Sequence, residues 1–287
     1  MKRNILRVIA FVLFGIAIYS GYKFFNEIKP YIEGEQTYQS VANQFAVTDT
    51  TTAGDEAAPP QIVTLSPEQI AAGVPTPTLI PTPSPEQLDL RRLNRLIRVD
   101  FPGLRSVNEE NVGWIFSEGT NINYPLMMGA DNYYYLRHLF DRTENKLGSI
   151  FVDSRNKPGF VDDTTVIYGH NMSDKSMFAT LENYKKQEYF DQHPSIYILT
   201  PEKTLRVDLF AGYLAKPADI TSLNFTFDSI AAKHTFVEDA KKRSTFVSPV
   251  TVGDEDQLVS FFTCAYDFYD ARYILQGKVV TLWEAGN

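Results

Sequence analysis

The chain has 287 residues, of which 44% are apolar and 13% aromatic, enough to form a packed core. Its formal net charge of −8 argues against a nucleic-acid partner, which would call for a clustered basic surface. A single cysteine excludes an intramolecular disulfide, and the four histidines show no metal-ligand spacing. We therefore expect no structural metal, no cofactor and no nucleic-acid partner.

The N-terminus combines basic residues with an uncharged apolar run. Arg7 precedes residues 8–22, which carry no charge. The run is short for a span of about 20 residues, but snorkelling of Arg7 and Lys23 can extend it. A cleaved signal peptide is the alternative, although no convincing Ala-x-Ala site follows the run. We predict a single-pass anchor in the cell membrane within residues 1–25, with the N-terminus cytoplasmic and the rest extracellular.

The next segment changes composition. Residues 26–84 are rich in Thr, Glu, Ala, Gln and Pro, and prolines alternate with other residues near its end. The alternating prolines favour an extended, solvated conformation and cannot join a sheet ladder, whereas part of residues 25–45 could continue as helix. We predict an extracellular tether over residues 26–84, followed by a globular domain over residues 85–287.

The globular part begins with a helix and continues with short β-like runs. Ser84, Pro85 and Gln87 form a helix-start signature, so residues 85–99 are predicted to be an amphipathic helix. Short apolar runs separated by turn residues predict strands at 112–116, 124–128, 149–152, 164–168, 195–199, 205–214, 258–264 and 272–283. Helical inserts are expected at 132–140, 176–184 and 228–243. The pattern indicates a mainly β protein with a closed or nearly closed barrel.

The single cysteine lies where chemistry is feasible. If residues 258–264 and 272–283 are neighbouring strands, Cys264 and Arg272 lie at one rim of the barrel. A nearby cation favours the ionised form of a thiol, whose ordinary pKa is about 8.5. Arg272 could equally hold the oxygen of an acyl-transfer intermediate. The alternative is that Cys264 is a small core residue, as free cysteines often are.

Covalent catalysis by cysteine also needs a general acid and base. His170 ends the apolar strand 164–168 after a glycine, where strand-end loops present side chains. The other three histidines suit packing or surface positions. His170 is therefore the candidate.

Cys264 preceded by Thr263, followed by Arg272, and His170 in "YGHNM" resemble the catalytic set of sortases, transpeptidases of Gram-positive surfaces. The resemblance covers about residues 88–283 and is closest to class B. It rests on an ordered series of segments: "NVGWIFSEGTNINYPLMMGADNYYYLRHLFD", "GSIFVD", "VIYGHNMSDKSMFATLENY", the insert at 228–243 and "ARYILQGKVV". It implies a closed eight-stranded β-barrel with an N-terminal helix and a helix in the long connection before the cysteine-bearing strand.

The resemblance also implies roles. Cys264 would attack the carbonyl of a threonine in a sorting signal and form a thioester. His170 would protonate the departing amine and then deprotonate the incoming one, and Arg272 would stabilise the oxyanion. The implied partners are a surface protein or pilin with an Asn-Pro-x-Thr-like signal, and an amine of a peptidoglycan precursor or pilin lysine as acceptor.

Two features depart from the pattern of many relatives. They often have leucine and serine near the cysteine, where this chain has bulky Phe262 before Thr263. Phe262 shares a strand face with Cys264 by two-residue alternation, so both Phe262 and Thr263 are predicted to shape the substrate groove. Asp267 is the nearest match to an acidic residue that orients the histidine in some class B members, and a solvated loop carboxylate is at least as good an interpretation.

Two other functions remain open at this stage. A cysteine peptidase would release its product to water, although the order of His170 before Cys264 differs from that in papain-like enzymes. A catalytically silent surface scaffold would need none of the three residues, so their joint presence counts against it.

Overall fold

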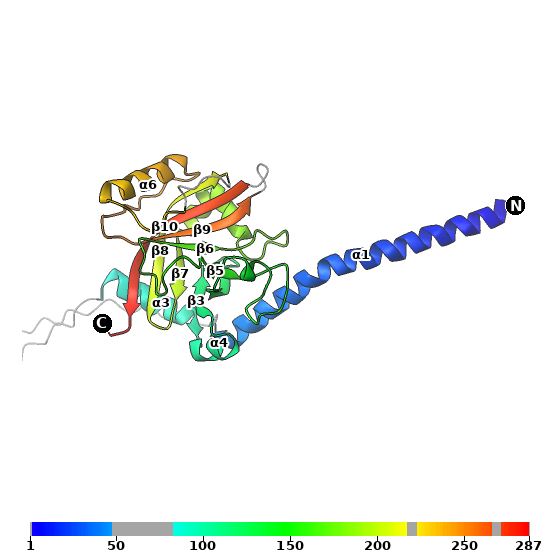
Figure 1. The fold of residues 1–287 in the computed structure, drawn as a ribbon, viewed down its shortest axis with the longest axis horizontal. Coiled ribbons are helices and arrows are strands. Elements are labelled where there is room, and N and C mark those ends of the chain that lie inside the picture. Colours follow the sequence, from blue (N-terminus) through cyan, green and yellow to red (C-terminus); the bar gives the residue numbers. More distant parts are fainter. Residues whose placement is uncertain (1, 48–82, 217–222, 266–270, 287) are drawn as a thin grey trace, which may run out of the picture.

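The computed structural model describes residues 2–47, 83–216, 223–265 and 271–286. A closed barrel forms the body of the molecule, and a long helix extends away from it to the N-terminus (Figure 1). The cysteine-bearing strand lies between two neighbours within this barrel. A mainly β fold with a closed eight-stranded barrel is therefore confirmed.

The order of strands around the barrel is β10-β8-β7-β3-β4-β5-β6-β9, and β9 pairs with β10 to close it. Most neighbours are antiparallel, but β4 pairs with β5, and β6 with β9, in parallel. The strands are β3 (Asn111–Phe116), β4 (Asn123–Met127), β5 (Ile150–Val152), β6 (Thr164–Tyr168), β7 (Ser195–Leu199), β8 (Lys203–Ala215), β9 (Leu258–Ala265) and β10 (Ala271–Glu284). All eight overlap the predicted strands.

The barrel is filled by large side chains from several strands. Trp114, Phe151 and Phe261 are almost completely buried and belong to one apolar core. A second cluster, which includes Val166, Phe210 and Ile274, lies beside helix α6. Because side chains on both faces of β6 and β9 are buried, these strands appear in the sequence as continuous apolar runs.

Helix α3 (Pro85–Leu96) begins as predicted. The Ser84 side chain accepts a hydrogen bond from the Gln87 backbone N–H, and the Gln87 side chain accepts one from the Ser84 N–H, which completes a capping box. The helix ends earlier than expected because residues 98–99 form a short strand, β2 (Arg98–Val99). β2 pairs with β1 (Ala46–Val47), which follows helix α1.

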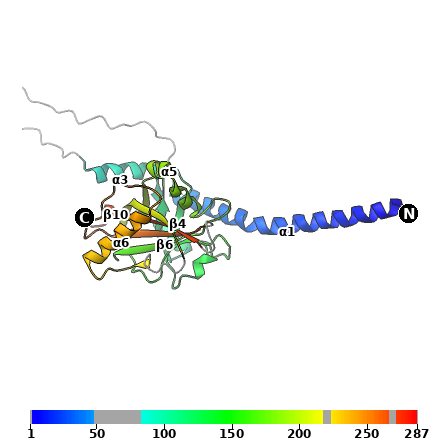
Figure 2. The same cartoon turned by 90° about the horizontal axis from the view of Figure 1, so that it is seen from above.

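The predicted insert before the cysteine-bearing strand is present as helix α6 (Ile230–Arg243), capped by Ser229. It lies against the outside of the barrel, as both views show (Figure 2). The other two expected inserts are shorter: 3-10 helix η1 (Tyr134–Leu136) replaces the helix at 132–140, and η2 (Ala179–Lys185) replaces that at 176–184. Helices α4 (Phe101–Val107) and α5 (Gln187–Gln192) were not predicted.

Helix α1 (Lys2–Phe45) is much longer than the apolar run at its start. Its last turns pack on the barrel, where Tyr38, Val41 and Phe45 are buried in the main core. The first third of the expected tether, residues 26–45, is thus helical, and residues 48–82 lie outside the described part of the chain. The predicted boundaries between tether and domain stay a prediction.

The membrane anchor predicted in residues 1–25 is contradicted. Within the described ranges, no helix is long and apolar enough to cross a membrane. The uncharged stretch covers only residues 8–22, and at about 1.5 Å per residue such a stretch is shorter than the hydrocarbon core of about 30 Å. The predicted single-pass location, which depended on this span, is wrong for the same reason.

Candidate active site

A cleft of about 270 Å³ opens where β6, β9 and β10 meet. Its walls combine aromatic and aliphatic surface with an imidazole, a hydroxyl and a guanidinium. The lining residues are Asn132, Leu136, Phe151, Tyr168, Gly169, His170, Phe262, Thr263 and Arg272. Four of these, His170, Phe262, Thr263 and Arg272, are residues that the sequence singled out.

The strand pairing explains why residues far apart in sequence meet here. Tyr168 of β6 is the parallel partner of Phe262 in β9, and the Gly169 N–H extends this pairing to the Phe262 carbonyl at 3.1 Å. His170 and Cys264 each lie two residues after this pair. Because the two segments run in the same direction, both residues lie at the same end of the barrel. Cys264 is in turn the antiparallel partner of Arg272. The backbones of the three predicted catalytic residues thus lie at one rim.

His170 is held by contacts on both its backbone and its ring. Its carbonyl accepts a hydrogen bond from the Phe178 N–H at 2.9 Å, and its Nε2 lies 2.8 Å from the Leu136 carbonyl oxygen. A carbonyl only accepts, so in this geometry a neutral His170 carries its proton on Nε2 and its lone pair on Nδ1. A larger residue at Gly169 would force its neighbours to shift, because a Cβ there would come within 2.7 Å of the Phe178 ring at Cγ as well as within 2.5 Å of Ile150 Cδ1.

Arg272 is the second residue of β10 and is partly buried at the rim. One guanidinium nitrogen, Nη1, donates to the Ala271 carbonyl at 3.2 Å. Its side chain also borders the cleft, where a planar guanidinium can direct several N–H donors at developing negative charge.

The two predicted groove residues lie in the cleft wall. Phe262 is 8% exposed, and its ring centre lies 5.6 Å from that of Tyr168. Thr263 is 2% exposed, and its Oγ1 has no hydrogen-bond partner within the described residues. A buried hydroxyl without a partner is costly, and the part of Thr263 in the substrate groove stays a prediction.

Two predicted features cannot be placed. Asp267 lies outside the described residues, and Cys264 is described only by its backbone position in β9. The roles of both residues stay predictions. Among the residues with described side chains, no group of three His, Cys, Asp or Glu is arranged to hold a metal ion.

Five lining residues were not singled out as site residues from the sequence: Asn132, Leu136, Phe151, Tyr168 and Gly169. Tyr168 offered a signal, since it lies two residues before His170 at the end of an apolar strand. Asn132 and Leu136 offered none, because they belong to an irregular segment that was expected to be a helix.

Comparison with known proteins places these observations in a family. The model of the sortase domain matches residues 118–280. Sortase B of Listeria monocytogenes is 33% identical over 191 residues, which are 66% of this chain and 77% of that protein. Sortase B of Staphylococcus aureus is 31% identical over 186 residues, covering 64% of this chain and 76% of that protein.

Solved structures agree with this assignment. Sortase B of Clostridium perfringens superimposes with a TM-score of 0.60 at 29% identity, covering 63% of this chain and all of that chain. A Staphylococcus aureus sortase B-substrate complex gives a TM-score of 0.62 at 28% identity, covering 69% of this chain and 92% of that chain.

Proposed function

Since this chain belongs to the sortase family, as a class B member, we propose that it cleaves a sorting signal after threonine through a thioester on Cys264. The acyl group then passes to an amine. Splitting peptide exchange into two acyl transfers lowers the barrier of each step.

The proposed first step forms a bond between Cys264 Sγ and the threonine carbonyl carbon and breaks the peptide bond that follows. His170 gives a proton to the departing amine. In the second step an incoming amine attacks the thioester, His170 removes its proton, and the Cys264 thiolate leaves, which restores the thiolate and protonated His170 that began the first step. Arg272 stabilises the negative oxygen in both steps.

One observation carries this proposal most directly. Cys264 is the cross-strand partner of Arg272, and the parallel β6–β9 pairing brings His170 to the same end of the barrel. A nucleophile, a proton carrier and a cation at one rim are the groups that acyl transfer requires. The cleft beside them supplies room for an extended peptide.

The proposed donor is a surface protein or pilin with an Asn-Pro-x-Thr-like signal. The proposed acceptor is an amine of a peptidoglycan precursor or of a pilin lysine. The existence of a substrate complex of a class B relative supports recognition of a peptide of this kind.

Intact-mass spectrometry of the full chain tests the proposal. The protein is incubated with Asn-Pro-x-Thr and Leu-Pro-x-Thr peptides, with and without an amine acceptor. We expect an acyl adduct that amine discharges faster than water does, and no adduct on Cys264→Ala, whose circular dichroism should match that of the wild type.

Other outcomes would point elsewhere. An adduct discharged equally fast by water alone would indicate a cysteine peptidase. An adduct that persists on Cys264→Ala would exclude this nucleophile, and no adduct with either peptide would favour a silent scaffold.

A further inference from the structure

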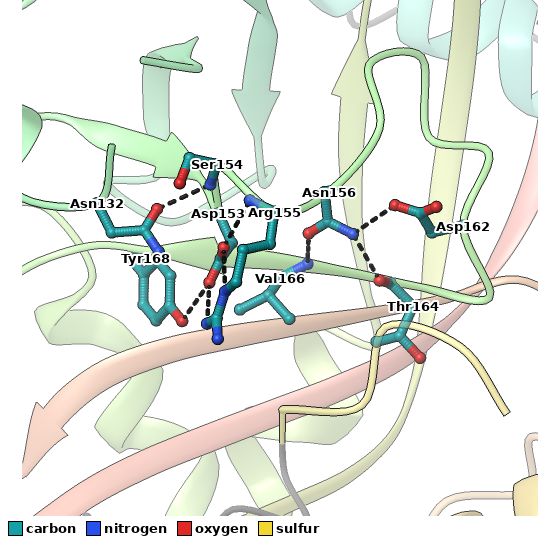
Figure 3. Close-up of polar contacts among 9 residues, drawn as sticks. All are labelled: Asn132, Asp153, Ser154, Arg155, Asn156, Asp162, Thr164, Val166 and Tyr168. Atoms are coloured by element: carbon teal, nitrogen blue, oxygen red, sulfur yellow. Dashed lines mark hydrogen bonds and ion pairs between the residues drawn. The ribbon is translucent and has the colours of Figure 1, made fainter. Parts of the chain in front are cut away.

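A buried carboxylate lies directly behind the cleft. Asp153 follows β5, and its side chain is fully inaccessible to solvent. Arg155 donates hydrogen bonds to both carboxylate oxygens, from Nε to Oδ1 at 2.9 Å and from Nη2 to Oδ2 at 2.7 Å. The Tyr168 hydroxyl donates to the same Oδ2 at 2.8 Å (Figure 3). The carboxylate therefore joins a side chain of the cleft wall to an arginine outside it.

The protonation states of Asp153 and Tyr168 favour the hydrogen bond between them. Burial alone would raise the pKa of Asp153, but hydrogen bonds from Arg155, Asn132 and Tyr168 lower it to about 2. Burial, together with the nearby negative Asp153, raises the pKa of Tyr168 above its usual range. At neutral pH the carboxylate is thus ionised and the phenol keeps the proton that it donates.

Tyr168 is the member of this cluster that borders the cleft. Its ring lies between those of Phe151 and Phe262, at centre-to-centre distances of 5.4 and 5.6 Å. Asn132 also borders the cleft. Its side chain accepts a hydrogen bond at 2.8 Å from the N–H of Ser154, the residue between Asp153 and Arg155 in the sequence (Figure 3). A shift of the Asp153 segment would therefore move two parts of the wall.

The far end of the cluster contacts the segment that leads into α6. The Arg155 guanidinium lies 4.7 Å from the centre of the Phe225 ring. The Phe225 carbonyl accepts a hydrogen bond from the Thr164 N–H at 3.1 Å, which ties the same segment to β6. Arg155 is therefore restrained on two sides, although its side chain is 55% exposed.

We propose that Asp153 and Arg155 are positioning residues that fix Tyr168 and so set the width of the cleft that receives the peptide. Neither residue lines the cleft, so they act on the substrate only through the wall they hold. The part concerning peptide recognition rests on the proposed function, whereas the part concerning cleft width does not.

The test uses the full chain with two substitutions. Arg155→Gln removes the ion pair with Asp153, and Tyr168→Phe removes the hydroxyl that donates to Asp153. Arg92→Gln is the matched control, because Arg92 lies on α3, pairs with Glu118 after β3, and does not line the cleft. Since Cys264 is the single cysteine, alkylation reports on this site alone. The first measurement is the ratio of the rates at which bulky N-phenylmaleimide and small iodoacetamide alkylate Cys264. The second is KM and kcat for the peptide.

We expect both variants to change the alkylation ratio and to raise KM by about tenfold, with a smaller effect on kcat, while Arg92→Gln changes neither. An unchanged ratio in both variants, with normal thermal unfolding, would overturn the positioning role. If the alkylation ratio changes but the protein forms no acyl adduct with any peptide, the role in cleft width is supported and the proposed function is refuted. Asp153→Asn can fail to fold because its site is buried, and the two named variants make the test independent of it.

Discussion

Arg272 is a residue whose geometry matters as much as its charge. Its guanidinium borders the cleft opposite Cys264, where it can direct more than one N–H at an oxyanion. Lysine keeps the charge but offers only a compact ammonium. We expect Arg272→Lys to lower kcat for peptide cleavage by about 10²–10³, the usual effect of losing one oxyanion donor.

Steady-state kinetics with a fluorogenic sorting peptide would measure this effect. Arg92→Lys, an exposed arginine of α3, is the control and should retain full activity. Wild-type kcat in Arg272→Lys would show that charge alone is sufficient.

Asp153 makes the stability of the protein depend on pH. Its folded-state pKa of about 2 lies below the unfolded-state value of about 3.9. The stabilisation is therefore fully present above about pH 4 and is lost as the pH falls through about 2. A difference of about 1.9 pKa units corresponds to about 2.6 kcal/mol, of which about 2 kcal/mol is lost between about pH 5 and pH 2.

Urea unfolding between about pH 5 and pH 2 would test this dependence. The free energy of unfolding of the wild type should exceed that of Asp153→Asn at the upper end, and the difference should shrink by about 2 kcal/mol at the lower end. A difference that does not vary with pH would mean that Asp153 has the same pKa in both states.

At the scale of elements, the docking of α1 on the barrel depends on a buried tyrosine, Tyr38. The Tyr38 hydroxyl donates to the Gly148 carbonyl at 2.5 Å and lies 3.0 Å from Ser149 Oγ, and its ring meets Tyr124 edge to face. Tyr38→Phe keeps the ring but leaves buried polar groups without a partner. We expect the free energy of unfolding to fall by about 1–3 kcal/mol.

Thermal or urea unfolding would measure this loss. Tyr133→Phe makes the same chemical change at a side chain that is 79% exposed, and it should unfold like the wild type. Equal stability of both variants would mean that the hydrogen bonds of the Tyr38 hydroxyl contribute nothing to the stability of the fold.

The elements also show what the sequence could reveal. The strands and α6 were predictable because apolar runs, turn residues and a capping serine are local signals. The helix predicted at residues 132–140 was wrong, although their aromatic composition suited one. The Asp131 carboxylate accepts hydrogen bonds from the Tyr133 and Tyr134 N–H groups and supports only a single 3-10 turn. Contacts such as that of Leu136 with His170 join segments 34 residues apart, and no periodic pattern encodes them.

At the scale of the whole molecule, the position of the site depends on the strand that closes the barrel. β9 pairs with β6 on one side and β10 on the other, so its backbone is hydrogen-bonded at both edges before it reaches Cys264. Its residues 258–261 are almost completely buried. In contrast, the first half of α1 has exposed side chains from residue 11 to residue 25 and lies away from the barrel (Figure 1).

This difference predicts a gradient in amide hydrogen exchange. Amides of residues 258–261 can exchange only when the closed barrel opens, so they should exchange at the rate of global unfolding, whereas those of residues 11–25 should exchange through local fraying. Hydrogen-exchange mass spectrometry in increasing urea would measure both rates, with buried β8 as the internal reference. Exchange of residues 258–261 that is faster than that of β8 and insensitive to urea would mean that β9 opens by itself. The rim would then be assembled only part of the time, and kcat would report on that opening instead of on the chemistry of Cys264, His170 and Arg272.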